Sequence, residues 1–388
     1  ADRVVVMLRG KKVEEGNVNE IFHNPKHPYT KSLLSVVPKL GSMKGRPLPA
    51  KFSNIDIKRS EGDDVVDTNN NELIDIKDNV RRSNPPILEI TNLTTRFSVK
   101  SGFGFSNGNV HAVEGIDLLL LQGETIGIVG ESGCGKSTLG KSIMRLVEPN
   151  SGKIKIKGKD IISLSKKDMF PIRKDVQIVF QDPYSSLNPR LTVGQIVSEG
   201  MKLHQVCHET EIKDKLIEVF KKVGLSEFHI NNYPHEFSGG QRQRIGIARA
   251  LALSPSIIIA DEAVSALDVS IQAQVINLMM ELQEEYGLSY LFISHDMAVI
   301  ERVCHRVAVM YLGEIVELGS RSQVFENPQH PYTKKLMKAV PVADPKLRKK
   351  EFNLMTDEIP SLVKPNGYEP EKINLIKVEE GHFIKPYN

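Results

Sequence analysis

The 388-residue sequence contains only three cysteines, Cys134, Cys207 and Cys304. They are too few and too scattered for a disulfide framework or a zinc site, and this agrees with a reducing compartment. Purely apolar runs are short as well. Leu118–Leu121 and Ile257–Ala260 fall far below the roughly 18 residues that a membrane-spanning helix needs. The sequence thus argues against a disulfide-rich secreted domain and against an integral membrane protein, and any role at a membrane requires a partner.

A large excess of one charge is also missing, because the formal net charge is only +3. That value does not suggest a nucleic-acid-binding protein. The start of the chain lacks a basic region before its apolar residues, so it does not resemble a signal peptide. Basic residues from Lys39 to Arg59 precede acidic residues from Glu61 to Asp67, within a stretch poor in periodicity. We therefore expect residues 39–86 to be a solvated linker.

One segment of the sequence occurs twice. Arg3–Pro38 aligns without a gap on Arg306–Pro341, and 19 of the 36 positions are identical, including the shared "HPYTK". This degree of similarity in one register indicates an internal repeat. Since the second copy follows a long domain, we expect residues 1–38 to be the C-terminal remnant of a similar first domain, in either a fused protein or a truncated gene. A proline opens each "PYTK" and is expected to start a helix.

From Ile87 onward, short strand-like runs alternate with helical patterns. "ETIGIVG", "VQIVF", "SIIIAD" and "LSYLFIS" are apolar on both faces, which is typical of buried parallel strands. The pattern predicts an α/β domain over residues 87–320 with a mainly parallel core sheet. Helical periodicity alone fills about 190–252, which predicts a helical subdomain inserted into the order of the strands.

A phosphate-binding loop is predicted by "GESGCGKST", which lies between an apolar strand and a helical pattern. Its glycines allow the backbone N–H groups to face inward, the helix N-terminus favours an anion, and Lys136 can reach the terminal phosphates. The predicted nucleotide-binding residues of this loop are Gly130, Glu131, Ser132, Gly133, Cys134, Gly135, Lys136, Ser137 and Thr138. The Ser137 hydroxyl is a predicted Mg²⁺ ligand.

Two adjacent carboxylates follow the strand "SIIIADEA". Asp261 is suited to hold Mg²⁺, and Glu262 to orient and deprotonate an attacking water. Together with the phosphate loop, this pair predicts a P-loop nucleotide hydrolase.

Further motifs narrow the class. "VFQDP", "FSGGQ", "SALD" and "ISHD" occur in this order around the two motifs above. The whole series resembles the ATP-binding cassette of ABC transporters. That resemblance implies a P-loop cassette with an antiparallel β subdomain, and two cassettes that close head to tail so that each contributes to both ATP sites.

The resemblance also assigns roles. Gln181 would touch Mg²⁺ and the attacking water, His295 would contact the γ-phosphate, and Asp268 would couple the two sites. Ser238, Gly239, Gly240 and Gln241 would cap ATP held by the opposite cassette. Phe97 fits best as the aromatic residue that stacks on adenine, with Phe103 and Phe105 as rivals and a core role open for each. Phe237 stands where the family more often has leucine.

The segment 321–388 contains "NPQHPYTKKLMKAVP" and resembles the C-terminal extension of the oligopeptide, dipeptide and nickel importer ATPases. Many relatives carry cysteines near its end for an iron–sulfur cluster, but this chain has none after Cys304, so we predict no cluster. The resemblance implies an ATPase that powers oligopeptide or dipeptide import from the cytoplasmic face of the membrane. Its expected partners are a sister ATPase or a second copy, two permease subunits and, indirectly, a solute-binding protein, with no nucleic acid. A nickel or glutathione importer, a non-transport ABC protein and an inactive isolated chain remain alternatives.

Overall fold

The computed structural model describes residues 2–53, 56–60, 63–67, 74–100, 106–340, 344–347 and 361–387. Phe103 and Phe105, two of the aromatic candidates, lie outside these residues. Within the described part of the chain, no helix has the length and apolarity to cross a membrane.

The main sheet begins with five strands that run parallel in the order β12-β13-β14-β9-β15. These are β12 (Val176–Val179), β13 (Ile257–Asp261), β14 (Ser289–Ile293), β9 (Thr125–Val129) and β15 (Arg306–Tyr311). The sheet continues antiparallel through β16 (Glu314–Ser320), β19 (His382–Ile384) and β18 (Ile376–Glu379). The expected mainly parallel α/β core is confirmed. The sheet's last two strands come from the C-terminal extension.

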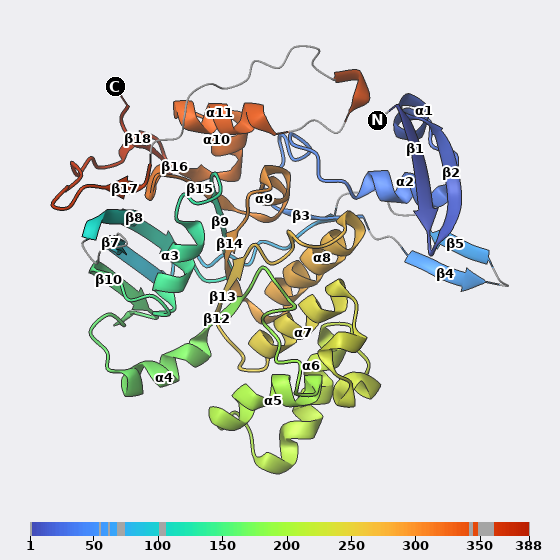
Figure 1. The fold of residues 1–388 in the computed structure, drawn as a ribbon, viewed down its shortest axis with the longest axis horizontal. Helices are drawn as coiled ribbons and strands as arrows, with labels where there is room; N and C mark the ends of the chain where they lie inside the picture. The colour runs from blue at the N-terminus through green and yellow to red at the C-terminus, as the bar shows by residue number, and fades with distance from the viewer. Residues whose placement is uncertain are drawn as a thin grey trace.

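An antiparallel sheet lies beside the core (Figure 1). Its strands, in spatial order, are β11 (Lys159–Asp160), β10 (Ser151–Ile156), β7 (Leu88–Lys100), β8 (Ser106–Leu120) and β17 (Val363–Lys364). Ile126, Ile128 and Leu139 of the core pack with Leu88, Ile90 and Leu118 of this sheet in one buried cluster. The expected antiparallel β subdomain is thus present, and it shares a core with the phosphate-loop strand.

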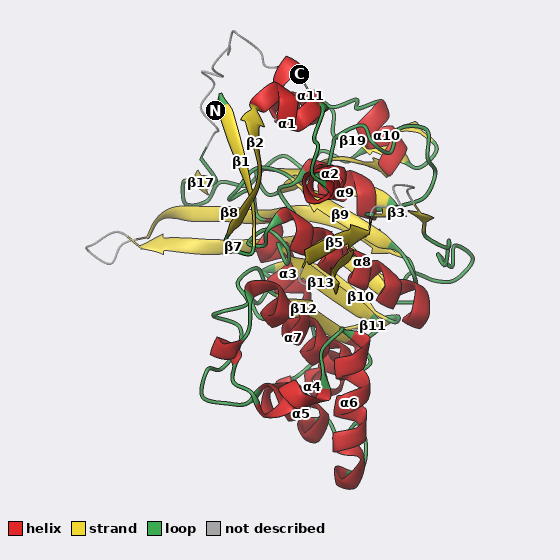
Figure 2. Cartoon of the chain, turned by 90° about the vertical axis from the view of Figure 1, so that its right-hand side faces the viewer, coloured by secondary structure: helices red, strands yellow, loops and turns green. Residues whose placement is uncertain are grey.

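The helices cover the core and form the expected inserted subdomain, which gathers at one end of the molecule (Figure 2). The inserted helices are α5 (Val193–Leu203), α6 (Ile212–Lys222) and α7 (Gly239–Leu251), with 3₁₀ turns at Glu209–Glu211, Glu227–Asn231 and Pro234–Glu236. The remaining helices of the cassette are α3 (Lys136–Ile143), α4 (Lys166–Asp175), α8 (Val269–Tyr286) and α9 (Met297–Val303), and the C-terminal extension contributes α10 (Arg321–Glu326) and α11 (Pro331–Ala339). A last 3₁₀ turn spans Pro345–Leu347.

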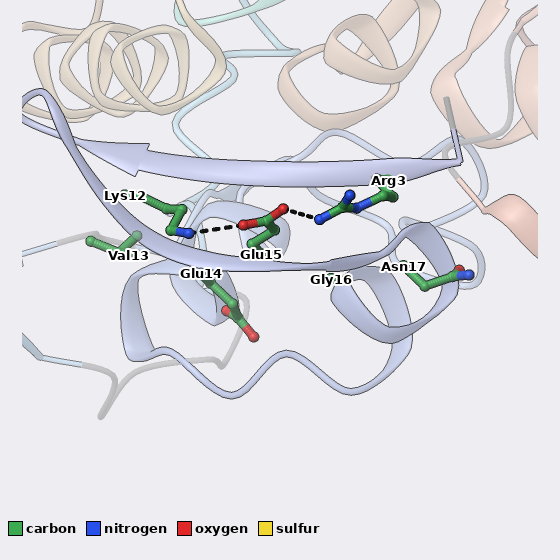
Figure 3. Close-up of a pocket in the computed structure, with 7 residues that line it drawn as sticks. All are labelled: Arg3, Lys12, Val13, Glu14, Glu15, Gly16 and Asn17. Atoms are coloured by element: carbon green, nitrogen blue, oxygen red, sulfur yellow. Dashed lines mark hydrogen bonds and ion pairs between the residues drawn. The ribbon is translucent and has the colours of Figure 1, made fainter.

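The first repeat forms a small unit of β1 (Arg3–Leu8), β2 (Lys11–Asn17), α1 (Val18–His23) and α2 (Pro28–Ser35). Pro28 and Pro331 each occupy the first turn of a helix, as expected. Glu15 bridges Arg3 and Lys12 across a shallow hollow on this unit (Figure 3). The hollow belongs to the repeat and not to the nucleotide motifs.

The described residues between the repeat and the cassette differ from the expected solvated linker. They include the short strands β3 (Ala50–Lys51), β4 (Asp56–Ser60), β5 (Asp63–Asp67) and β6 (Ile74–Asp75). Residues 41–52, which contain β3, form a strap that contacts α8 and α9. Met43 and Phe52 are buried. The Phe52 backbone exchanges two hydrogen bonds of 2.8 Å with the Asn277 side chain, and Glu301 accepts the Gly41 N–H at 2.8 Å. Because buried polar side chains of the cassette form hydrogen bonds with its backbone, this polar segment can pack on the cassette.

Candidate functional site: the phosphate loop and the carboxyl ends of the core strands

The predicted motifs meet at one edge of the core sheet. Gly130 follows β9, Gln181 follows β12, Glu262 follows β13 and His295 follows β14. Because these strands are parallel and adjacent, their carboxyl ends face the same crevice, which is where open α/β sheets bind ligands.

The loop after β9 needs its glycines. Gly130, Gly133 and Gly135 have φ values of 152°, 82° and 107°, which residues other than glycine rarely adopt. A Cβ added at Gly135 would lie 1.8 Å from the Ala112 carbonyl oxygen, whereas one at Gly133 meets nothing within 4 Å. The loop is therefore packed on its inner side and open at Gly133, where a ligand can approach the backbone.

Lys136 begins α3 and is buried. Its ammonium group donates hydrogen bonds of 2.8 Å to the carbonyl oxygens of Gly130 and Glu131. Phosphate oxygens can replace these two acceptors. Burial raises the pKa of the Cys134 thiol beside it, so this cysteine remains neutral and serves as packing within the loop.

Ser137 and Asp261 point at each other across the crevice. The Ser137 hydroxyl donates to Asp261 Oδ1 at 2.7 Å. Burial raises the pKa of Asp261, and the hydrogen bond from Ser137 opposes this effect. A hydroxyl and a carboxylate oxygen this close suit a hard, oxygen-preferring cation such as Mg²⁺, which would also offset the cost of burying the Asp261 charge.

Glu262 has a left-handed backbone conformation with φ of 49°. This conformation costs energy for a residue other than glycine and is concentrated at functional sites. Its N–H donates to the Ile293 carbonyl at 2.9 Å, and its Oε2 lies 3.2 Å from Nδ1 of His295. Two groups predicted to act on the attacking water and the γ-phosphate are therefore already adjacent, while Gln181 is exposed at the same edge.

The "FSGGQ" segment lies at the start of α7, where Ser238 and Gln241 form a capping box. A Cβ at Gly240 would lie 2.2 Å from the Ile271 side chain, so α7 and α8 pack closely there. Among the described residues, no hydrogen bond or ion pair joins 238–241 to residues 130–138. Asp268 occupies the N-cap position of α8 and is exposed.

The aromatic candidate Phe97 is 39% exposed on β7. It pairs in register with Val110 of β8, which pairs in turn with Val363 of β17. The C-terminal extension thus adds a strand beside the one that faces Phe97. Arg96 next to it is bound by the carboxylates of Glu114 and Glu369, and these bonds raise the pKa of Arg96. Sequence reasoning did not find this contact, which joins residues 273 positions apart.

Two family profiles match the chain. "ABC transporter" matches residues 113–265, and "Oligopeptide/dipeptide transporter, C-terminal region" matches twice, at residues 13–56 and 316–367. The chain belongs to the ABC transporter family, in its oligopeptide/dipeptide group. The double match agrees with the internal repeat.

The curated relatives of this ABC chain include proteins named glutathione import ATP-binding protein GsiA. The one from Pectobacterium atrosepticum is 52% identical over 387 residues, covering 99% of this chain and 60% of the relative. The one from Salmonella paratyphi A is 50% identical over 392 residues, with the same coverage of 99% and 60%. The chain thus spans about three fifths of the length of these relatives.

Solved structures of ABC proteins share the fold. The cbiO1 protein of Clostridium perfringens, part of the ABC transporter complex cbiONQ, aligns with a TM-score of 0.55 and 29% identity over 66% of this chain and 100% of its own. The MJ0796 cassette, a dimer in a post-hydrolysis state bound to ADP and Pi, aligns with a TM-score of 0.54 and 29% identity over 60% of this chain and 98% of its own. The expected P-loop cassette fold is confirmed.

Proposed function

We propose that this chain binds ATP with Mg²⁺ and hydrolyses it to power import through an ABC transporter. The observation that carries the proposal is the constellation at the carboxyl edge of the core sheet. Lys136, the Ser137–Asp261 pair at 2.7 Å and the Glu262–His295 pair at 3.2 Å converge there on the open phosphate loop. Family membership and the fold of the ADP-bound neighbour support the same activity.

In this proposal Lys136 transfers its hydrogen bonds from the loop carbonyls to the terminal phosphates of ATP. Ser137, Asp261 and Gln181 would hold Mg²⁺, and the bound ion would supply positive charge beside the phosphate oxygens. Glu262 orients the attacking water and accepts its proton, and His295 contacts the γ-phosphate, where charge increases during transfer. Phe97 stacks on the adenine.

The second half of each ATP site comes from another cassette. Residues 238–241 have no described bond to the chain's own phosphate loop, and their N-terminal helix position can present backbone N–H groups to an anion. We place them against ATP on the opposite cassette, with Asp268 coupling the two sites. The partner is a sister ATPase or a second copy of this chain.

The residue ranges of the proposed organisation follow the repeat. Residues 1–38 are proposed to end a first cassette, residues 39–86 to connect it, residues 87–320 to form the cassette described above and residues 321–388 to form its importer-type extension. The second match of the C-terminal profile at residues 13–56 supports this division.

The cargo is proposed to be a short peptide. The names of the relatives favour glutathione, itself a tripeptide, over the oligopeptides and dipeptides expected first, and nickel is the alternative that is not a peptide. The chain would dock on two permease subunits at the cytoplasmic face of the membrane, with a solute-binding protein as an indirect partner.

The experiment that tests the activity compares the full chain with its Glu262→Gln variant, alone and mixed with a sister ATPase. We expect phosphate release by the wild type to rise on pairing. We expect the variant to lose about 10²–10⁴-fold in turnover, the typical contribution of a general base, and to retain Mg·ATP. Lys136→Ala is the matched control and should lose binding itself. Unchanged hydrolysis in Glu262→Gln would remove Glu262 from this role, and full turnover by a strict monomer would contradict the two-cassette site.

A further inference from the structure

The C-terminal extension contacts the phosphate loop directly. Tyr332, in the "HPYTK" of α11, accepts a hydrogen bond of 3.0 Å at its hydroxyl oxygen from the backbone N–H of Glu131. The two residues are 201 positions apart, and the tyrosine is only 8% exposed. A side chain outside the nucleotide motifs therefore reaches the loop that holds the phosphates.

This hydrogen bond acts on one particular peptide group. The Glu131 N–H and the Gly130 carbonyl belong to the same peptide unit, and Lys136 donates to that carbonyl at 2.8 Å. Tyr332 and Lys136 thus hold opposite ends of the Gly130–Glu131 peptide. Gly130 has φ of 152°, so one side of this peptide is a residue with wide rotational freedom.

The tyrosine is itself held in place. Its ring lies against that of Tyr311, with centroids 4.2 Å apart and planes inclined by 36°. Its N–H donates to Nδ1 of His330 at 3.1 Å. The strand turn after Tyr311 also contacts the loop, because the Gly313 N–H donates to the Cys134 carbonyl at 3.0 Å. Residues 131 and 134 of the loop are therefore both fixed from the second repeat.

We propose that Tyr332 is a positioning residue for the phosphate loop, fixing the orientation of the Gly130–Glu131 peptide when nucleotide binds. This inference rests on the proposed function. When Lys136 turns to the phosphates it releases the Gly130 carbonyl, and the Tyr332 hydroxyl is then the side-chain bond that still holds this peptide. Without it, part of the binding free energy is spent on ordering the loop.

The proposal predicts a specific kinetic signature. Tyr332→Phe keeps the ring against Tyr311 and removes only the hydroxyl. One net hydrogen bond corresponds to a change of about 3- to 10-fold in an equilibrium constant. Because the loop holds ground state and transition state alike, we expect a rise of this size in KM and in the Kd for Mg·ATP, with kcat unchanged.

The test uses the full chain and a matched control from the same sequence. Tyr29 occupies the equivalent "HPYTK" position on α2, and among the described residues no hydrogen bond joins it to residues 130–135. Calorimetric titration with Mg·ATP would compare three proteins that all carry Glu262→Gln so that ATP is retained: one with no further change, which serves as the wild-type reference, one with Tyr332→Phe and one with Tyr29→Phe. Hydrogen–deuterium exchange would follow the peptide that contains Glu131, where Tyr332→Phe should exchange faster.

Weaker Mg·ATP binding and faster exchange in Tyr332→Phe, with Tyr29→Phe like the wild type, would support the inference. Equal affinity and equal exchange in all three proteins would overturn it, as would an equal loss in Tyr29→Phe. The proposed function is judged separately, because wild-type binding that Lys136→Ala abolishes would uphold it in either case. Absence of Mg·ATP binding in the wild type would overturn both.

Discussion

The two copies of the repeat share their local structure. In each, a glutamate on the second strand accepts two backbone N–H groups from the loop before the "HPYTK" helix. Glu14 accepts from Lys26 at 2.7 Å and His27 at 3.1 Å, and Glu317 accepts from Gln329 at 2.8 Å and His330 at 3.0 Å. The 36 residues of the repeat therefore specify the local structure of two strands, a loop and the "HPYTK" helix.

Their surroundings differ. β15 of the second copy pairs with the phosphate-loop strand β9 and with β16, whereas β1 belongs to a two-stranded sheet with β2. Val5 and Met7 are 49% and 56% exposed, and their counterparts Ala308 and Met310 are 0% exposed. Local hydrogen bonds thus specify the repeat, while a neighbouring cassette strand determines how much of it is buried. This supports the proposal that the first copy belongs beside a similar strand of its own cassette.

The largest effect is expected where the two glutamates differ most. Glu317 is fully buried, and its Oε1 also lies 2.8 Å from Nε2 of the buried His382. Glu317→Ala would leave two backbone N–H groups and this imidazole without their acceptor, at a cost of about 3–5 kcal/mol in the free energy of unfolding. Glu14→Ala should cost about 1 kcal/mol. Urea unfolding followed by circular dichroism measures both.

The control for this pair is Glu317→Gln, which keeps an acceptor oxygen and should recover part of the loss. Similar costs for Glu14→Ala and Glu317→Ala would mean that burial does not distinguish the two copies, and the comparison would fail at its main point.

A smaller difference is expected for the paired methionines on β1 and β15. Met310 is buried against the phosphate loop, where its methyl carbon would lie 2.8 Å from a Cβ added at Gly135. Met310→Ala removes packed atoms and leaves a cavity, which costs about 2–4 kcal/mol. Met7→Ala on the exposed face should change stability by less than about 0.5 kcal/mol.

The same urea titrations test this expectation in the full chain. If a preceding cassette is added upstream, the proposal predicts that Met7→Ala becomes as costly as Met310→Ala. A persistent small effect of Met7→Ala in such a two-cassette protein would show that β1 is not buried by a cassette strand.

Much of the cassette could be predicted from sequence because its determinants are local. A glycine-rich loop between an apolar strand and a helix predicts its own geometry, and parallel strands bring their carboxyl ends together without further information. For the same reason the sequence alone indicates that Lys136, Asp261 and Glu262 lie near one another at the carboxyl edge of the core sheet, while their roles stay predictions.

The strap and the extension contacts had no such local signal. Phe52 stands between Lys51 and Ser53 in a segment without strand or helix periodicity, and its partner Asn277 is 225 positions away. The hydrogen bond from Glu131 to Tyr332 likewise depends on how two distant segments pack. Composition predicts a solvated linker because the segment has few apolar residues. It contains no information on the hydrogen bonds by which side chains of α8 and α9 satisfy the backbone of this segment.

The smallest difference between the two copies is expected at the helix caps, where they should behave alike near neutral pH. His27 and His330 each accept an N–H from the tyrosine two residues on, at 3.1 Å. Replacing either by alanine should cost about 1 kcal/mol, the usual value of an N-cap, and asparagine should restore the bond.

Burial lowers the pKa of His330, so its folded form resists protonation. Its contribution is therefore complete above the ordinary histidine pKa and is lost as the pH falls through the lowered value. Thermal unfolding of wild type and His330→Asn between pH 7.5 and 5 would reveal this as a divergence: the two proteins should be similarly stable at pH 7.5, and the wild type alone should lose stability on acidification. If the difference in stability between the two proteins stays constant across that range, the pKa of His330 does not change on folding. Burial of the second copy would then have no effect on this cap.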